Sequence, residues 1–298
     1  MFHLVGGLSV DTPTAGTNWP VSPKDRVITY TTTGTITSVK LYYAADGTSF
    51  SLITTKTHTA PGTYTHTWTD MPDTVTNSAK VKVTDGNNES VVFATSGTFS
   101  LIGALDLTAP ESGAVVTAES AYLIQWDKGT AIGIANAKLE LSTDGGTTWA
   151  PIQEAEGTAN DGIVPNSGSY SWTAPATLTA SLKLRVSDPA NSASLNTGAG
   201  LSELRGQLTV TDPNDGAESW DVGSLYPITW SKKGNWAGAG YTVRLLYSAD
   251  DGATWTTLTG ATGLAAASGS WDWAITESIP TSAQARIRVQ GDPPYTTV

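Results

Sequence analysis

One short motif recurs along this chain at intervals of about 100 residues. Residues 142–149 read Ser-Thr-Asp-Gly-Gly-Thr-Thr-Trp, residues 248–255 read Ser-Ala-Asp-Asp-Gly-Ala-Thr-Trp, and residues 44–50 hold a shorter version, Ala-Ala-Asp-Gly-Thr-Ser-Phe. The same order of landmarks surrounds each copy. Later in each unit, basic and apolar residues alternate over four positions and end in a valine. These valines, Val83, Val186 and Val289, are 103 residues apart. A fixed period indicates a repeated structural unit, so the 298 residues should form three similar domains.

The third unit shows most clearly what each domain should be. Short alternating segments predict strands at 207–212, 225–230, 241–248, 254–258, 270–275 and 285–289. Turn residues separate them, and an Asp-Gly pair at 251–252 predicts a hairpin. No stretch combines a helical period with capping residues. We therefore expect an all-β fold of three tandem immunoglobulin-like β-sandwich domains in a rod. The expected domains are 1–103, 104–206 and 207–298.

Aromatic residues recur at two positions of each unit. Trp126 and Trp230 end one predicted strand, and Trp172 and Trp273 lie on a later one, with Tyr30 and Trp68 at these places in the first unit. A buried tryptophan removes about 150–250 Å² from water. These rings are therefore expected to meet between the sheets as core residues.

Composition excludes several classes of protein. The net charge of −11 leaves no basic stripe for nucleic acid. With no cysteine, thiol catalysis, Cys-ligated zinc and disulfides are excluded. No apolar run is long enough to span a membrane. The few Lys and Arg residues mostly occupy the outward positions of strands, where we expect them to keep the strands soluble and unpaired at their edges.

A resemblance to a known family covers most of the chain. It rests on residues 209–223 (Thr-Val-Thr-Asp-Pro-Asn-Asp-Gly-Ala-Glu-Ser-Trp-Asp-Val-Gly), on Ile-Thr-Trp at 228–230, and on Ala-Arg-Ile-Arg-Val at 285–289. These segments resemble an immunoglobulin-like repeat of secreted proteins, found in Ser/Thr-rich GPI-anchored fungal wall proteins and planctomycete surface-layer proteins. The resemblance implies an extracellular wall or surface-layer scaffold. The repeated hairpins also resemble the Asp boxes of sialidases, in which the box is a folding device away from the active site.

Clustered acidic turns suggest a metal ion. Asp212 and Asp215 share one turn, and Asp250 and Asp251 share another. Calcium takes six to eight oxygen ligands from flexible turns, so a Ca²⁺ site is a hypothesis here, although Asp is also an ordinary turn residue. No other cofactor is indicated. His58 and His66 flank a Pro-Gly turn and are the one histidine pair to consider as metal ligands.

Four tryptophans fall outside the repeated core positions: Trp19, Trp220, Trp236 and Trp271. Trp236 lies in a glycine-rich loop without a counterpart in the other units, and Trp220 follows an acidic turn. If exposed, they are candidates for stacking on sugars. They support the alternative function of a carbohydrate-binding module or adhesin, with surface glycans as partners.

The ends of the repeat do not match each other. Residues 2–8 (Phe-His-Leu-Val-Gly-Gly-Leu) align with residues 99–105 (Phe-Ser-Leu-Ile-Gly-Ala-Leu). Residues 2–6 therefore look like the last strand of a preceding domain, whereas the third unit has no counterpart of residues 98–101. One interpretation is a fragment of a longer repeat protein. The other is strand donation, in which Phe2, Leu4 and Val5 of one molecule complete the third domain of the next.

The sequence favours a non-enzymatic role. No Ser/His/Asp arrangement and no paired carboxylates for glycoside hydrolysis can be assembled. We expect a structural component of an extracellular array, such as a surface layer, wall or filament. Its partners would be copies of itself or further immunoglobulin-like domains of the same polypeptide.

Overall fold

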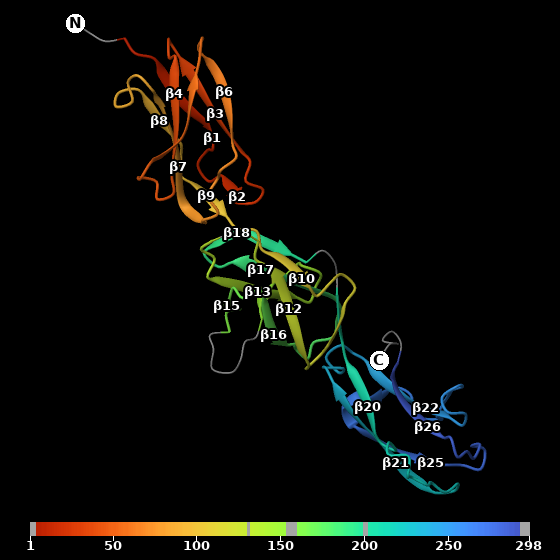
Figure 1. Cartoon of the computed structure of the whole chain (residues 1–298). Helices are drawn as coiled ribbons and strands as arrows, with labels where there is room; N and C mark the ends of the chain where they lie inside the picture. Colours follow the sequence, from red (N-terminus) through yellow and green to blue (C-terminus); the bar gives the residue numbers. More distant parts are fainter. Residues whose placement is uncertain (1–3, 130–131, 153–159, 199–201, 293–298) are drawn as a thin grey trace.

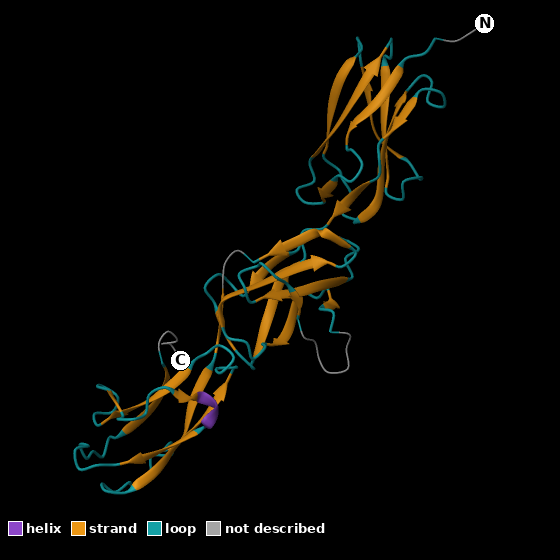
Figure 2. Ribbon diagram, turned by 180° about the vertical axis from the view of Figure 1, so that it is seen from behind, coloured by secondary structure: helices purple, strands orange, loops and turns teal. Residues whose placement is uncertain are grey.

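The computed structural model describes residues 4–129, 132–152, 160–198 and 202–292. The protein is all-β, with three immunoglobulin-like β-sandwich domains that follow one another in an elongated rod (Figure 1). Strands dominate each domain, and the helix in Figure 2 is the 3₁₀ turn Ala266–Ser268. Within the described ranges, no helix has the length and apolar character needed to cross a membrane.

The first domain packs a three-stranded sheet against a six-stranded one. The smaller sheet is antiparallel, in the order β1 (Gly7–Thr12), β3 (Arg26–Thr33), β6 (Gly62–Trp68). The larger has the order β2-β9-β7-β4-β5, with β8 on β7: β2 (Asn18–Pro20), β4 (Ser38–Ala44), β5 (Ser51–Thr57), β7 (Thr76–Asp85), β8 (Phe93–Thr95) and β9 (Phe99–Ile102). The last strand, β9, thus lies between β7 and β2 and pairs in parallel with β2.

The second domain repeats this plan. Its smaller sheet has the order β10 (Asp106–Ala109), β12 (Ala121–Asp127), β16 (Ser169–Thr173). Its larger sheet has the order β11-β19-β17-β13-β14, with β15 on β13 and β18 on β17: β11 (Val115–Thr117), β13 (Asn136–Ser142), β14 (Ala150–Pro151), β15 (Ile163–Pro165), β17 (Thr179–Asp188), β18 (Asn191–Thr197) and β19 (Ser202–Arg205). Here β19 takes the place of β9, between β17 and β11.

The third domain keeps the plan only in part. One sheet has the order β20 (Gln207–Asp212), β21 (Leu225–Lys233), β25 (Ser270–Ala274). In the other, β22 is the central strand: β22 (Thr242–Ser248), β23 (Thr256–Thr257), β24 (Leu264–Ala265) and β26 (Arg286–Gly291). Among the described residues, β26 pairs with β22 alone, and no strand stands where β9 and β19 lie in the other domains.

Strand positions predicted from the third unit are present, with shifted ends. β20 covers the predicted residues 207–212. β21 extends to Lys233, beyond the predicted end at Trp230. The hairpin arm predicted at 254–258 pairs only over Thr256–Thr257, because the Asp-Gly turn occupies its first residues.

The repeated aromatic residues form the cores, as predicted. All six are buried: Tyr30, Trp68, Trp126, Trp172, Trp230 and Trp273. The polar edge of each indole needs a partner when buried, and Trp126 donates to Asn166 Oδ1 at 2.8 Å, while Trp230 donates to the Ala266 carbonyl at 2.9 Å. The first domain has its own hydrophobic cluster, whereas the second and third domains share a continuous one.

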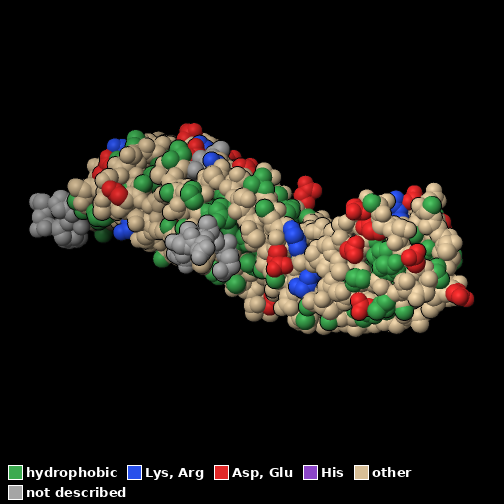
Figure 3. Space-filling model, turned by 90° about the horizontal axis from the view of Figure 1, so that it is seen from below, with side chains coloured by type: hydrophobic (Ala, Val, Ile, Leu, Met, Phe, Trp, Pro, Cys, Tyr) green, Lys and Arg blue, Asp and Glu red, His purple; other side chains and the backbone are tan. Residues whose placement is uncertain are grey.

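The surface carries few charged side chains. In Figure 3, uncharged polar side chains and backbone cover most of the visible face, and acidic and basic groups are scattered singly or in pairs. This matches a chain in which only 14% of residues are charged.

Candidate functional site

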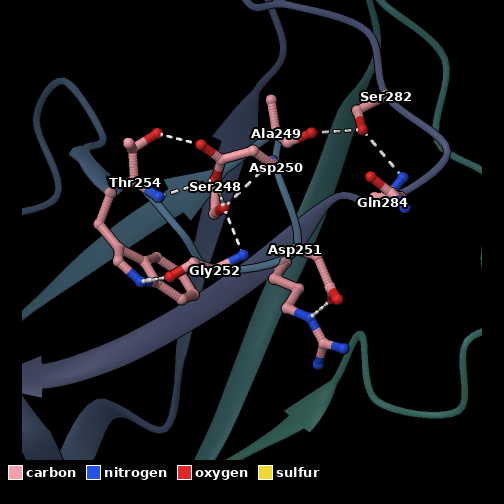
Figure 4. Close-up of polar contacts among 10 residues, drawn as sticks. Ser248, Ala249, Asp250, Asp251, Gly252, Thr254, Ser282 and Gln284 are labelled. Carbon is pink, nitrogen blue, oxygen red and sulfur yellow. Dashed lines mark hydrogen bonds and ion pairs between the residues drawn. The ribbon is translucent and has the colours of Figure 1, made fainter.

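The repeated hairpin turn is a closed hydrogen-bond network. In the third domain, Asp250 Oδ1 accepts from Ser248 Oγ at 2.7 Å and from Thr254 N at 2.8 Å, and Oδ2 accepts from Thr254 Oγ1 at 2.6 Å (Figure 4). Gly252 N donates to Ser248 Oγ, and Gly252 has a φ of 87°, a conformation that favours glycine. The second domain makes the same bonds around Ser142 and Asp144. The motif therefore folds the turn.

These bonds also set the acidity of the aspartates. Hydrogen bonds from the Thr254 side chain and backbone lower the pKa of Asp250 to about 2. Thr148 lowers the pKa of Asp144 in the same way, and Ser49 lowers that of Asp46 in the first domain. Because the donors favour the charged carboxylate, each turn is most stable when its aspartate is ionised.

Acid should loosen these turns, and Asp250→Asn tests this. An unfolded aspartate titrates near pH 3.9, so the stabilisation by Asp250 is fully present above about pH 4 and is lost as the pH falls towards 2. We expect the variant to melt below the wild type at pH 7, with a difference that shrinks between pH 4 and pH 2. Thermal melts by circular dichroism measure it, with Asp272→Asn on an exposed strand position as control. A difference independent of pH would contradict the role of Asp250.

The aromatic residue of each turn packs under a basic residue of the neighbouring strand. Arg288 lies 3.9 Å from the Trp255 ring centre, Arg185 lies 4.4 Å from that of Trp149, and Lys82 Nζ lies 4.6 Å from that of Phe50. Such cation–π contacts contribute about 0.5–2 kcal/mol each. These basic residues were expected only to keep the strands soluble and unpaired at their edges. Their stacking could have been found from the period, since turn aromatics and basic residues recur together.

The structure gives three of the four predicted calcium ligands other partners. No group of three or more Asp, Glu or His side chains is close enough to hold a metal ion in the described part of the chain. Asp250 serves its own turn, Asp251 pairs with Arg286, and Asp215 accepts from Ala217 N at 2.7 Å. Asp212 is the last residue of β20. Asp is thus used as a turn residue, the alternative stated for this pattern.

Of the two histidines, His58 has structural partners in the first sandwich. His58 Nε2 lies 2.8 Å from the Tyr30 hydroxyl, and its ring stacks on Tyr64 at 3.7 Å. Burial and the nearby Lys56 lower the pKa of both His58 and His66. The His58 ring packs on aromatic residues of the first sandwich, and neither histidine belongs to a group of three or more possible metal ligands among the described residues.

The first junction between domains is held by backbone and amide bonds. Val75 N donates to Ile132 O at 2.9 Å, and Ile132 N donates to Asp73 O at 2.8 Å. Asn191 Nδ2 donates to Asn77 Oδ1 at 2.7 Å. The loop between β6 and β7 thus docks on the loop between β12 and β13, and the start of β7 contacts the start of β18.

The second junction uses the corresponding loops. Asn235 N donates to the Ala176 carbonyl at 2.6 Å, and Gly234 N donates to Glu119 Oε2 at 2.5 Å. Lys233 Nζ adds a bond to Ser120 Oγ at 2.7 Å. In both junctions, the loop before the long strand of one domain contacts the loop after the second strand of the smaller sheet in the next.

Trp236 is the centre of the second junction, so the prediction that it is an exposed ligand contact is wrong. Its side chain is 1% exposed, and its indole N–H donates to Lys233 O at 2.9 Å. A Cβ at Gly206, the single residue between β19 and β20, would lie 2.8 Å from the indole. The Trp236 ring covers the linker between the two domains. Comparison of the repeats could not predict this contact, because it joins residues of different repeats.

Trp220 remains partly accessible. It stacks on Tyr226 with ring centres 4.9 Å apart and contacts Trp273 edge-on at 6.2 Å. In the first domain, Trp19 of β2 is buried against Phe99 of β9, but Trp220 lies one residue further from its preceding proline and glycine than Trp19 does. In the third domain no described strand covers it.

A groove lies along the uncovered side of β26. Its part next to Trp220 has a volume of about 390 Å³, and its lining includes Trp220, Trp273, Ile275, Ala285 and Ile287. A second part of about 860 Å³ continues between β20 and β26. The part next to Trp220 lies beside the start of the long strand, where β9 pairs in the first domain and β19 in the second.

Burial along the long strand confirms that the groove is open. Ala79 and Val81 in β7 are fully buried, and so are their counterparts in β17, Leu182 and Leu184. The next counterparts, 103 residues further on, are Ala285, which is exposed, and Ile287, which is half-buried. The third domain therefore presents apolar side chains that its two neighbours cover with their last strand.

The predicted assembly residues are located at the other end of the rod. Leu4 is 93% exposed and Val5 is 48% exposed, ahead of β1. Phe2 lies outside the described residues.

No model of a known protein family matches the chain, and no curated protein matches it. Several solved structures are similar. The fibronectin(III)-like modules of CbhA from Clostridium thermocellum are 17% identical, cover 66% of this chain and 94% of their own, and give a TM-score of 0.23.

Two further solved structures match more of the chain. An ectodomain fragment of ICAM-5 is 12% identical, covers 96% of this chain and 74% of its own, and gives a TM-score of 0.33. A three-domain structure of titin is 9% identical, with coverages of 85% and 82% and a TM-score of 0.29. At these identities the likeness concerns the fold alone. The chain is a tandem array of immunoglobulin-like domains, an architecture typical of cell-surface and extracellular proteins.

Proposed function

We propose that this chain is a non-enzymatic structural component of an extracellular array, such as a surface layer, wall or filament. The observation that carries the proposal is the pair of junctions, in which backbone and side-chain hydrogen bonds cross each domain boundary. A linker of one residue, Gly206, leaves little freedom between the second and third domains. A stiff rod of this kind is suited to holding other parts at a fixed spacing and to bearing load, and its repeated hairpin turns serve folding rather than chemistry.

The experiment that tests this role is the shape of single molecules in negative-stain electron micrographs. We expect extended particles with three lobes and one narrow distribution of bend at each junction. A broad distribution of bends would contradict a stiff structural component. The measurement does not depend on whether the molecules assemble further.

The alternative, a carbohydrate-binding module or adhesin, loses one of its two aromatic contacts with the burial of Trp236. Trp220 is the remaining one, and its ring faces Tyr226 in a stack with an interplanar angle of 3°. Specific retention on a polysaccharide gel that is lost in Trp220→Ala would favour this alternative over the structural role.

A further inference from the structure

We propose that a groove in the third domain, lined by Trp271, binds the sugar units of a neutral polysaccharide. This Trp271 groove lies between β25 and the hairpin of β22 and β23, and it has a volume of about 510 Å³. Small-ligand sites usually have volumes of about 300–1,000 Å³. The inference goes beyond the proposed structural role, because it gives the rod an attachment to a carbohydrate.

The Trp271 groove lies on the side of the sandwich away from β26. Its strand β25 lies beside β21 at the end of the rod opposite to the first domain (Figure 1), and among the described residues it pairs with β21 alone. In the other sheet, β23 pairs with one edge of β22 and β26 with the opposite edge. All lining residues fall between Tyr247 and Pro280. Described strands and turns therefore bound the groove.

Trp271 supplies the aromatic surface of the groove. It lies on the same face of β25 as Trp273, yet Trp273 is buried whereas Trp271 is only half-buried. Among the described residues, the Trp271 ring contacts no other aromatic ring and its indole N–H donates to no protein atom. A Cβ on Gly260 would lie 4.0 Å from Trp271 Cζ2, so the turn after β23 stands beside the ring. An indole offers an apolar face and one donor, which suit the C–H face and the hydroxyls of a sugar ring.

The rest of the lining is rich in hydroxyl groups and poor in charge. Six of its residues are serine or threonine: Thr254, Thr256, Thr257, Thr259, Thr276 and Ser278. Three of these are exposed, and their hydroxyls bond to no protein atom in the described part of the chain: Thr256, Thr257 and Thr259. No Lys or Arg belongs to the lining among the described residues. Its one acidic residue, Asp272, alternates with Trp271 and Trp273 along β25, so its carboxylate lies on the outer face of the sheet.

This lining selects the class of ligand. An anion would find no cation in the groove, and an apolar molecule would bury the threonine hydroxyls of β23 without partners, which costs free energy. A hydroxyl both donates and accepts hydrogen bonds, so these threonines match the hydroxyls of a sugar. A neutral sugar would therefore place its C–H face on Trp271 and its hydroxyls towards Thr256 and Thr257.

A buried hydrogen bond fixes one wall of the groove. Tyr247 is 8% exposed, and its hydroxyl donates to the Pro280 carbonyl at 2.7 Å, which ties the segment after β25 to the end of β22. The corresponding tyrosine of the first domain is Tyr43, which also stands three residues before the aspartate of its turn. The Tyr43 hydroxyl is buried without a partner among the described residues. The wall of the Trp271 groove is thus formed before a ligand binds, so little ordering opposes binding.

The test is affinity electrophoresis of the full chain in native gels that contain soluble mannan, β-glucan or galactan, with acidic polygalacturonate as the comparison. We expect at least one of the three neutral polysaccharides to retard the wild type. Trp271→Ala should weaken that binding at least about tenfold, because the stacking surface is lost. Trp271→Phe keeps an aromatic face and should retain part of the affinity. Retardation by none of the three, or by polygalacturonate alone, overturns the proposal.

Two further variants separate the groove from the fold and from the other tryptophan. Thr257→Arg fills the groove from an exposed position, so it should abolish binding while the melting temperature stays that of the wild type. Trp220 lies outside the lining and stacks on Tyr226, so Trp220→Ala should bind like the wild type. Binding that survives both Trp271→Ala and Thr257→Arg overturns the proposal. Stiff molecules that bind no sugar would leave the structural role standing, whereas flexible molecules that bind it would refute that role alone.

Discussion

Replacing Trp236 with alanine is expected to lower the free energy of unfolding by about 3–5 kcal/mol, the usual cost of removing a buried tryptophan. The ring is 1% exposed and packs on the linker residue Gly206. Its loss leaves a cavity in the hydrophobic cluster that the second and third domains share. Chemical denaturation followed by circular dichroism measures the change in stability.

The same substitution should also release the junction. We expect the radius of gyration of Trp236→Ala in X-ray scattering to differ from that of the wild type under native conditions, with a broader pair-distance distribution. Trp255→Ala is the matched control, because Trp255 is half-buried and lies at a hairpin turn away from both junctions. If Trp236→Ala scatters like this control, the ring is not what holds the two domains.

Placing a charge on β9 should unfold the first domain. Leu101 is fully buried and faces Thr76 across the edge of β7. Leu101→Asp would bury a carboxylate without a partner, so we expect a loss of more than about 4 kcal/mol of stability in that domain. Denaturation monitored by hydrogen exchange, which resolves the domains, measures it.

The neighbouring residue provides the control for this prediction. Ser100 alternates with Leu101 on the strand and is only half-buried, so Ser100→Asp should change stability by less than about 1 kcal/mol. Equal effects of the two substitutions would mean that the last strand contributes little to the sandwich. The open groove of the third domain would then have no energetic significance.

Much of the fold could be predicted because its information is local and repeated. The spacing of Val83, Val186 and Val289 places the long strand of each larger sheet, and the Asp-Gly pairs place the hairpins. The same spacing of 103 residues connects Thr76, Thr179 and Ser282, whose bonds to the turn were not foreseen but follow the period.

The candidate sites were harder to predict because they depend on contacts between repeats. Trp236 stood in a glycine-rich loop that suggested exposure, yet the adjacent domain covers that loop. Asp250 and Asp251 looked like oxygen ligands, but their carboxylates are engaged by Thr254 and Arg286. Trp220, in contrast, is half-buried and partly accessible, and Leu4 is exposed.

The central claim, that the three domains form a stiff structural rod, is tested most directly by distances between spin labels on neighbouring domains. The chain has no cysteine, so labels can be placed uniquely. Suitable exposed positions lie on corresponding strands: Thr65 of β6, Ser171 of β16 and Asp272 of β25. Two double-cysteine variants are needed, one with Thr65→Cys and Ser171→Cys and the other with Ser171→Cys and Asp272→Cys. In pulsed electron–electron double resonance, each should give one narrow distance distribution that matches the structure. Broad or multiple distances at either junction would contradict the claim.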